Sequence, residues 1–495
     1  MNKFSLNFLQ KSRYLTDRFF FRTYAVSSED LEKIRKFKED RKKKVEDPYR
    51  TFNILRDDFG RFKKGQFRTP TPKVPTYSEY VVVGGGIMGS SIAYSLKNRA
   101  PDSFEVMVIE RDPKYTRAST TLSVGGIRQQ YSLEENIKLS MYSADFLRNV
   151  KQHLSVLDDD PPDIQFQPQG YLFLATEAGV EQMLKNHKLQ TELGAKVELM
   201  RPRHMKETFP WMNTDDIALG SYVGFENEGW FDPWALLSAF KRKAISLGTT
   251  YVHGEVIGFE IEDKSHVKGE DAKPLFRSNY LYMKDELGDI HCVEFGFLII
   301  AGGAYSSDVA RLLMIGNGPG LLSTSIPVEP RKRYVYVFNC VTGPGINMPL
   351  IVDPNGVYVR REGLGGKYIC GRSPAPNEEP DTSNLEVDYN FFESHVWPTL
   401  AKRIPMFECI KVSSAWAGFY DYNSFDQNAI LGPHPYYENV FFATGFSGHG
   451  IQMAPAVGRA MMELLIDKCY VTIDLSRFHL DRVYEEKPLF EQHIV

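Results

Sequence analysis

The sequence predicts a mixed α/β (α+β) fold, in which a Rossmann-like nucleotide-binding domain is joined to a second lobe of antiparallel strands. Three observations support this prediction: a glycine-rich turn between a strand and a helix at 79–112, a strand-rich stretch at 165–229, and a second glycine-rich turn at 445–450. The strand-rich stretch interrupts the chain between the two turns. We therefore expect the nucleotide-binding domain to be assembled from separated segments.

The first glycine-rich turn has the spacing of a dinucleotide-binding motif. Strand residues 80–83 lead directly into Gly84, Gly86 and Gly89, and helix-forming residues 90–97 follow. In such a motif the first glycine permits the tight turn, the second lets the backbone approach a pyrophosphate, and the third lets the helix pack closely on the sheet. The free N–H groups of the helix N-terminus then face the phosphates.

A second strand, 105–109, ends at Glu110, about 20 residues after the last glycine, where a carboxylate binds the ribose hydroxyls. The alternative, a glycine-rich surface turn, does not account for strand, motif, helix, strand and acid within one short unit. The sequence therefore predicts a dinucleotide site.

Composition excludes several other classes of protein. The 495 residues allow two or three domains, and 42% hydrophobic and 25% charged residues are ordinary for a globular chain. A net charge of −4 gives no reason to expect nucleic-acid binding. Five widely spaced cysteines predict neither a disulfide framework nor a metal site. We expect no membrane span, because no stretch of about 18 apolar residues occurs.

The N-terminus resembles a targeting segment followed by a charged arm. Residues 1–24 are basic, acid-poor and rich in aromatic residues, which predicts import into the mitochondrial matrix; a merely basic tail is the alternative. Residues 25–76 are predicted to form a helix that begins near Ser28 and ends in the basic run 41–44, followed by a proline-rich linker. This arm is expected to be solvated or to dock on a partner, and its basic run could touch the inner membrane peripherally.

The remaining elements follow in order. Small hydroxyl residues and glycines at 118–130 suit a segment beneath a cofactor, with Arg128 as the strong charge at its end. Strands are predicted at 170–175, 250–252, 255–257, 295–300, 333–338, 356–360, 367–371 and 440–444, and helices at 234–247 and 456–468.

Taken in this order, residues 78–480 resemble the D-amino-acid-oxidase-like flavoproteins, which include sarcosine oxidase, dimethylglycine dehydrogenase and glycine oxidase. The residues that carry the resemblance are 82–89, Val108-Ile109-Glu110, Asp232-Pro233, Ala301-Gly302-Gly303-Ala304, Trp416-Ala417-Gly418, the stretch from Ser424 to Gly432, and 445–450. The resemblance implies a flavin domain formed by 77–150, 230–326 and 411–480, a substrate lobe formed by 151–229 and 327–410, and a tail at 481–495.

The resemblance also implies FAD as the cofactor and assigns residues to it. The FAD-binding residues would be Gly84, Gly86, Ile87, Met88, Gly89, Glu110, Arg111, Ser119, Thr120, Val256, Ala301, Gly302, Gly303, Gly445, Phe446, Ser447, Gly448, His449 and Gly450. Val256 would meet the adenine through its backbone, and 445–450 would face the pyrimidine end of the flavin.

For catalysis, the resemblance implies Arg128, His449 and Gln452. Arg128 would bind the carboxylate of a small amino-acid-like substrate, although it could instead pair with a protein carboxylate or contact flavin. His449 would donate hydrogen bonds to flavin, with a proton-carrying role as the alternative. Gln452 replaces a lysine that promotes the oxygen reaction of sarcosine oxidase, so we expect dehydrogenase behaviour. The positions of covalent flavin attachment fall near Leu122 and Asp421, so the FAD is expected to be non-covalent.

Two functions are weighed. The leader and arm resemble a mitochondrial branch of the family that is associated with assembly of respiratory complex I, which implies complex I subunits or assembly intermediates as partners. The chain would be an amine-oxidising flavoenzyme there, or alternatively an FAD-binding assembly scaffold with little turnover. An NAD-dependent dehydrogenase is disfavoured because it leaves the turns at 301–303 and 445–450 unexplained.

Overall fold

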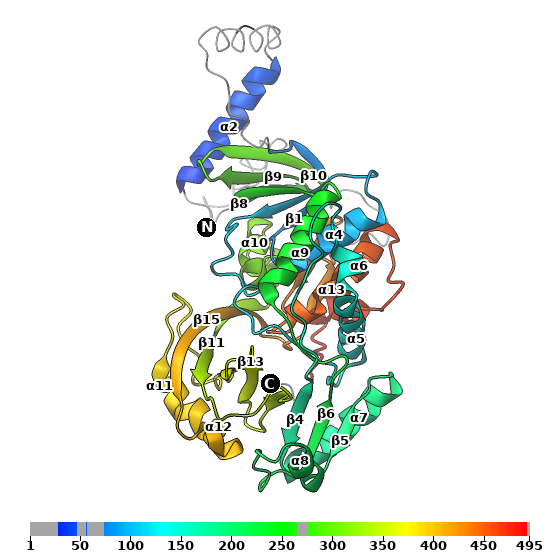
Figure 1. Cartoon of the computed structure of the whole chain (residues 1–495). Helices are drawn as coiled ribbons and strands as arrows, with labels where there is room; N and C mark the ends of the chain where they lie inside the picture. Colours follow the sequence, from blue (N-terminus) through cyan, green and yellow to red (C-terminus); the bar gives the residue numbers. More distant parts are fainter. Residues whose placement is uncertain (1–27, 47–55, 57–73, 265–275, 493–495) are drawn as a thin grey trace, which may run out of the picture.

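The computed structural model describes residues 28–46, 56, 74–264 and 276–492. The predicted targeting segment 1–24 and the linker from 47 to 73, apart from residue 56, therefore lie outside the described residues. Two sheets occupy opposite halves of the molecule, the first in the upper half of Figure 1 and the second in the lower half. The predicted fold class, a mixed α/β fold with a nucleotide-binding sheet and a largely antiparallel second sheet, is confirmed.

The first sheet has seven strands around a parallel core. Its strands are β1 (Tyr77–Val83), β2 (Val106–Glu110), β8 (Thr250–Asp263), β9 (Phe276–Asp285), β10 (Ile290–Ile300), β16 (Ile430–Pro433) and β17 (Val440–Thr444). β1 lies between β2 and β10, so that Val82 is in register with both Val108 and Ile299. β9 pairs antiparallel with β8 and β10, and β16 forms an antiparallel edge beside β17. Parallel strands are covered on both faces, which explains the continuous apolar run of β1.

Helices cover the two faces of this sheet. On one face Val82 packs with α4 (Ile87–Arg99), α9 (Pro233–Ser246) and α13 (Gly450–Ile466), and α5 (Glu134–Arg148) packs beside α13. The neighbouring Val81 and Val83 point to the other face, toward α10 (Ser306–Leu312), because successive strand residues alternate. Gly458 permits the close contact of α13 with α4, since a Cβ there would lie 2.2 Å from Ser91 Oγ.

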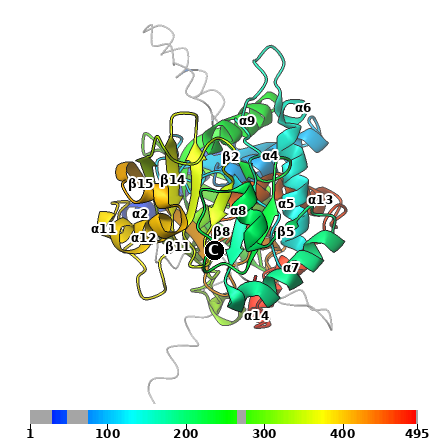
Figure 2. The same cartoon turned by 60° about the horizontal axis from the view of Figure 1, so that its bottom comes forward.

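The second sheet has eight strands, in the order β15 (Lys411–Asn423), β11 (Val328–Asn339), β14 (Lys367–Gly371), β13 (Tyr358–Glu362), β12 (Leu350–Val352), β4 (Tyr171–Ala175), β6 (Leu219–Val223) and β5 (Glu198–Met200). Only the β12–β4 pair is parallel. The outer face of this eight-stranded sheet packs on α11 (Tyr389–Phe391), the π-helical turn Phe392–Val396 and α12 (Trp397–Arg403) (Figures 1 and 2).

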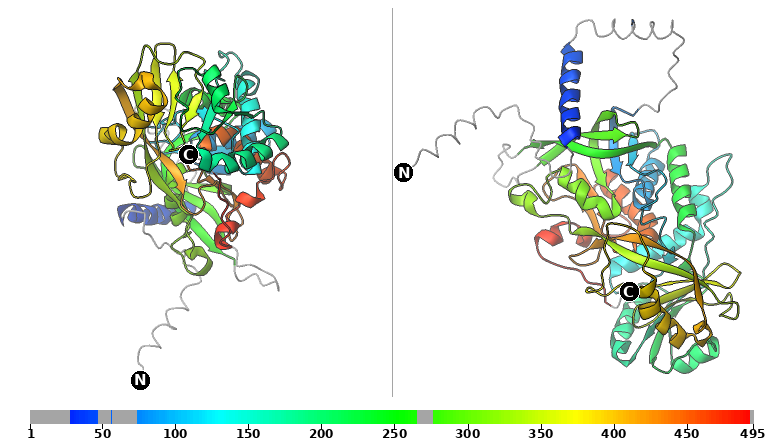
Figure 3. Two further views of the ribbon diagram at one scale, coloured as in Figure 1. Left: turned by 90° about the horizontal axis from the view of Figure 1, so that it is seen from below. Right: turned by 90° about the vertical axis from the view of Figure 1, so that its left-hand side faces the viewer.

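The remaining elements are short or peripheral. They are the two-stranded pair β3 (Gly126–Ile127) and β7 (Gly229–Trp230), the helices α6 (Val150–Leu154), α7 (Val180–Glu192), α8 (Pro202–Thr208) and α14 (Asp481–Tyr484), and the N-terminal helix α2 (Ser28–Glu46). The β3–β7 pair lies at the junction between the two sheets: Trp230 of β7 packs on Tyr171 and Leu350 of the second sheet, and the chain continues from β3 to α5 and from β7 to α9, which cover the first. Helix α2 projects from the β8–β9–β10 end of the first sheet (Figures 1 and 3).

Three boundaries differ from the sequence prediction. Helix α13 begins at Gly450 rather than 456, and includes Pro455 in its second turn, although proline usually favours the first turn of a helix. β8 is one strand from Thr250 to Asp263, where two short strands were predicted. The predicted return to the flavin domain at 411 is too early, because β15 pairs along β11 and belongs to the second sheet.

Candidate functional site

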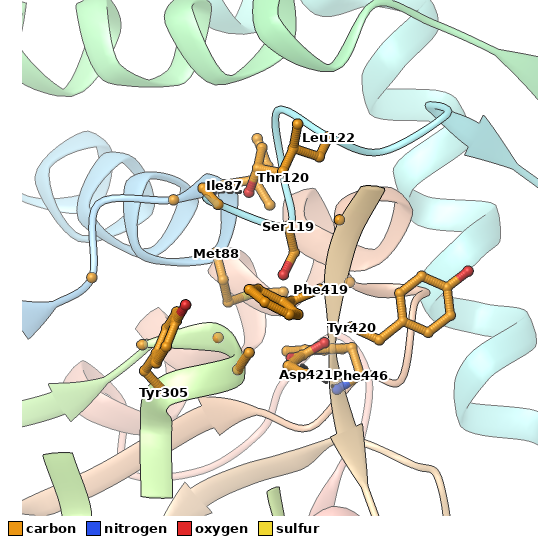
Figure 4. A pocket seen from close by; sticks show the side chains of 18 of the residues that line it. Ile87, Met88, Ser119, Thr120, Leu122, Tyr305, Phe419, Tyr420, Asp421 and Phe446 are labelled. Carbon is orange, nitrogen blue, oxygen red and sulfur yellow. Dashed lines mark hydrogen bonds between the residues drawn. The ribbon is translucent and has the colours of Figure 1, made fainter. Parts of the chain in front are cut away.

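One elongated cavity of about 410 Å³ runs from the glycine-rich end of the first sheet to the inner face of the second. Ile87 and Met88 enter it from the start of α4, whereas Ser119, Thr120 and Leu122 lie on the segment above (Figure 4). Phe419, Tyr420 and Asp421 come from β15, with Tyr420 on the opposite side of the strand from the other two (Figure 4). The cavity therefore joins segments that are hundreds of residues apart in sequence.

The two outer glycines of the motif are required by backbone crowding. Gly84 has φ +108°, and a Cβ there would lie 2.3 Å from the carbonyl oxygen of Ala301. A Cβ on Gly89 would lie 1.9 Å from the carbonyl oxygen of Gly84. Gly89 does not line the cavity, so its role is to let α4 approach the turn.

The start of α4 supplies donors to the cavity. Its N-cap, Gly86, has no side chain to accept from the first N–H groups, and Thr120 Oγ1 accepts only from the Ile87 N–H, at 3.1 Å. Glu110 lines the same end, where its two oxygens accept from the N–H groups of Gly85 and Asp112 at 2.8 Å each. These contacts fix the orientation of the Glu110 carboxylate and leave further lone pairs for a ligand.

Most of the other predicted cofactor residues also line the cavity. They are Arg111, Ser119, Val256, Ala301, Gly302, Gly303, Phe446, Gly448, His449 and Gly450. Gly445 and Ser447 do not line it: both have positive φ, and Ser447 Oγ accepts from the Asn423 N–H at 2.9 Å. These two residues thus shape the loop that precedes α13.

Arg128 lies at the far end of the cavity, directly after β3, and is 5% exposed. Its guanidinium stacks between Tyr131 and Phe173, 5.0 and 4.9 Å from the ring centroids. Its Nη2 donates to His449 Nε2 at 3.0 Å, while its Nε has no hydrogen-bond partner in the described part of the chain. The Arg128 N–H donates to Gln452 Oε1 at 2.8 Å, and Gln452 Nε2 donates to Tyr131 Oη.

No carboxylate of the described residues lies within ion-pair distance of Arg128. Glu228 interacts electrostatically with Arg128, is fully buried, and accepts from the Gln129 N–H. Burial raises the pKa of Glu228 well above its ordinary value, and the Gln129 N–H and the charge of Arg128 oppose this shift.

Burial also shifts the pKa values of two titratable groups in the cavity wall. The pKa of His449 is lowered to about 3, first by burial and then by the charge of Arg128. His449 is therefore neutral near pH 7, which argues against the proton-carrying alternative. Burial raises the pKa of Asp421 to about 6, although the Phe446 N–H, which donates to its Oδ2 at 3.1 Å, opposes this shift.

Sequence reasoning did not single out several residues of the cavity. Phe419 and Tyr420 line it and directly follow the Trp416-Ala417-Gly418 motif, which was the available signal. Tyr171 and Arg333 line it without any comparable signal. Of the three tyrosines in the predicted strands 333–338 and 356–360, Tyr358 lines the cavity, but Tyr334 and Tyr336 pack in the outer core. They alternate with Val335, which faces inward.

These features fit a dinucleotide cofactor. Only glycine fits the turn at Gly84 and Gly89, the N-cap residue Gly86 offers no side chain to the N–H groups of α4, and Tyr305 Oη at the cavity wall is buried without a partner in the described residues. Beyond the glycine-rich turn, the cavity continues to the buried guanidinium of Arg128. A nucleotide site joined to a substrate-sized chamber defines a dinucleotide-dependent oxidoreductase. Within the described residues no cluster of three or more metal-type ligands occurs, and no helix is long and apolar enough to span a membrane.

Comparison with known proteins identifies the family. The model of the FAD dependent oxidoreductase (DAO) family matches residues 79–464, and the chain belongs to this family. It is 52% identical over 435 residues to FAD-dependent oxidoreductase domain-containing protein 1 of Xenopus laevis, covering 86% of this chain and 87% of that protein. It is 40% identical over 485 residues to the Drosophila melanogaster homolog, covering 95% and 91%.

Among solved structures, L-proline dehydrogenase from P. horikoshii superposes with a TM-score of 0.70 at 25% identity, covering 84% of this chain and all of that chain. The FAD-dependent oxidoreductase class and the fold are thereby established. NAD as the main cofactor is not supported.

Proposed function

We propose that the chain is a flavoenzyme that oxidises the C–N bond of a small amino-acid-like amine. The observation that carries the proposal is Arg128: a buried guanidinium at the cavity wall, stacked on two rings and without a carboxylate partner in the described chain. A buried charge without a counter-ion is costly, so such a site is stabilised when an anionic ligand binds. A carboxylate suits the planar fork of arginine.

The surrounding side chains would position this group. Gln452 accepts from the Arg128 N–H and fixes the backbone, and neutral His449 accepts from Nη2 and fixes the guanidinium. The bound FAD would supply the hydride acceptor, while the protein supplies position, water exclusion and electrostatics. Hydride transfer from a neutral amine requires no general base, and we assign none.

We further propose that the FAD is non-covalent and reacts slowly with oxygen. The two positions at which relatives of this fold class attach flavin fall near Leu122 and Asp421, and neither side chain suits the cysteine or histidine linkage. Gln452 is neutral where sarcosine oxidase has lysine, so a fixed positive charge is absent from that position.

An anaerobic amine screen tests the enzymatic proposal. The FAD-loaded protein is mixed with paired amines that differ only in a carboxylate, and bleaching of the flavin absorbance is followed. We expect bleaching by at least one amino acid and not by its decarboxylated partner. Arg128→Met should abolish this preference, whereas Arg128→Lys should retain part of it. Bands that resist every amine but bleach with dithionite would refute catalysis of this kind.

A second candidate is a flavin-bearing assembly factor for respiratory complex I in the mitochondrial matrix. It is supported by the basic leader at 1–24, by neutral Gln452, and by helix α2, which projects from the body (Figure 3). The test is expression of Arg128→Met in cells that lack the protein. Full restoration of complex I by this variant would favour the assembly role, and failure by a variant that still folds and binds FAD would favour catalysis.

A further inference from the structure

Helix α2 is docked on the first sheet by a small apolar cluster. Ile34 is 1% exposed and packs against Ile257 of β8 and Tyr282 of β9, with Phe37 beside it. Lys38 forms an ion pair with Glu260 at 3.1 Å. Leu31, Ile34 and Phe37 recur at helical spacing, so the sequence itself marks one face of α2 for burial.

The first turn of α2 reaches the cofactor cavity. Asp30 is 9% exposed, lines the cavity, and pairs with Lys284 of β9 at 3.4 Å. Lys284 also lines the cavity, together with the bulged β8 segment around Val256. This end is opposite to the one that holds Arg128, and Glu110 is the predicted ribose ligand nearby. The arm therefore forms part of the wall where the adenosine half of the cofactor is expected.

The family model begins at residue 79, after α2. The helix is consequently an addition to the family core, and its contact with the cavity is a property of this chain's own residues. A carboxylate and an ammonium group at the wall suit a ligand that carries hydroxyl and amino donors and ring-nitrogen acceptors, which describes adenosine.

We propose that α2 is a component of the FAD site, and that docking of α2 and binding of the adenosine half of FAD stabilise each other. Asp30 belongs to α2, so its contacts with the ligand, and its ion pair with Lys284 of β9, exist only while the helix is docked. By linkage, if docking of α2 raises the affinity for FAD by some factor, FAD binding raises the equilibrium constant for docking by the same factor. Release of the arm then weakens cofactor retention, and cofactor loss loosens the arm.

The test uses the full-length chain with Ile34→Asp, which places a charge in the apolar cluster and undocks α2. The matched control is Lys36→Asp on the exposed face of the same helix. Dissociation constants are measured by quenching of flavin fluorescence on titration of apoprotein with oxidised FAD. We expect Ile34→Asp to weaken FAD binding about 10-fold, a typical coupling, and the control to leave it unchanged. Riboflavin, which lacks adenosine, should bind both variants and the wild type equally.

Hydrogen exchange of α2 provides the reciprocal measurement. FAD should slow exchange of residues 28–46 in the wild type but not in Ile34→Asp. Lys284→Met, which leaves the apolar cluster intact, should weaken FAD binding without a loss of folded structure. The proposal is overturned if α2 exchanges freely in Ile34→Asp while FAD affinity equals that of the wild type. No amine enters these measurements, so their outcome is independent of the proposed catalytic activity.

Discussion

Gln452→Met offers a quantitative check on the architecture of the chamber. Methionine has nearly the volume of glutamine, but it neither accepts strongly nor donates. The substitution leaves the Arg128 N–H without its acceptor and removes the donor to Tyr131 Oη. All three residues are at most 5% exposed, so water does not replace these bonds.

The expected loss of stability follows from these two hydrogen bonds. An orphaned buried donor costs about 1–3 kcal/mol and the second hydrogen bond about 0.5–1.5 kcal/mol, so we expect a loss of about 2–4 kcal/mol in the free energy of unfolding. With an unfolding entropy of about 2.1 cal/mol/K per residue, each kcal/mol lowers the Tm of a chain this long by about 1 °C. The expected fall is therefore about 2–4 °C for the FAD-loaded protein, measured by calorimetry at fixed FAD concentration.

Gln190→Met is the matched control. Gln190 is 2% exposed and donates to the carbonyl oxygen of Tyr131 at 2.8 Å, but it does not touch Arg128 or line the cavity. Both variants should lower the Tm, whereas only Gln452→Met should weaken binding of a simple carboxylate such as acetate, read from the flavin spectrum. Equal carboxylate affinity in Gln452→Met and wild type, or an unchanged Tm, would refute the positioning of Arg128 by Gln452.

Three further predictions concern the cofactor. Gly89→Ala places a Cβ 1.9 Å from the Gly84 carbonyl oxygen and should abolish FAD retention, whereas Gly345→Ala, with no atom within 4 Å, should leave the flavin content of the purified protein unchanged. Asp421 has its pKa raised by burial from 3.8 to about 6, so its contribution to stability is present below pH 3.8 and is lost as the pH rises through 6. The flavin spectrum of the wild type should therefore change between about pH 5 and 7, and an identical change in Asp421→Asn would contradict this assignment. Acid precipitation should release all flavin into the supernatant, and yellow pellets would show a covalent bond.

Local sequence patterns were sufficient to predict the nucleotide-binding end of the site. The strand, the three glycines and Glu110 lie within one βαβ unit, and their geometry depends on its backbone. The predicted strand 80–83 accordingly lies within β1, the glycine turn leads into α4, and β2 ends at Glu110. The contact between Gly84 and Ala301 completes that turn from a distant segment, which only the motif at 301–304 suggested.

The substrate end could not be predicted to the same extent. Which of Tyr334, Tyr336 and Tyr358 faces the cavity depends on strand register, and a shift of one residue reverses the answer. The docking of α2 likewise depends on a three-residue stripe whose partner lies more than 200 residues away. The predicted helix at 456–468 starts too late, because α13 begins at Gly450 and tertiary packing keeps Pro455 inside it, against the ordinary preference of proline.

The separation of the cavity walls along the chain has a consequence for biosynthesis. The glycine turn at 84–89 is made early, but the wall at 446–452 follows β17, which pairs with β10. At about 5–20 residues per second, Gly450 leaves the ribosome roughly 20–70 seconds after Gly84. Until residues 440–452 have been made, Leu298–Ile300 of β10 lack their β17 partner and the cavity lacks the wall at 446–452. Cofactor capture is thus among the last events in maturation, and the nascent chain must remain protected from edge-to-edge association until then.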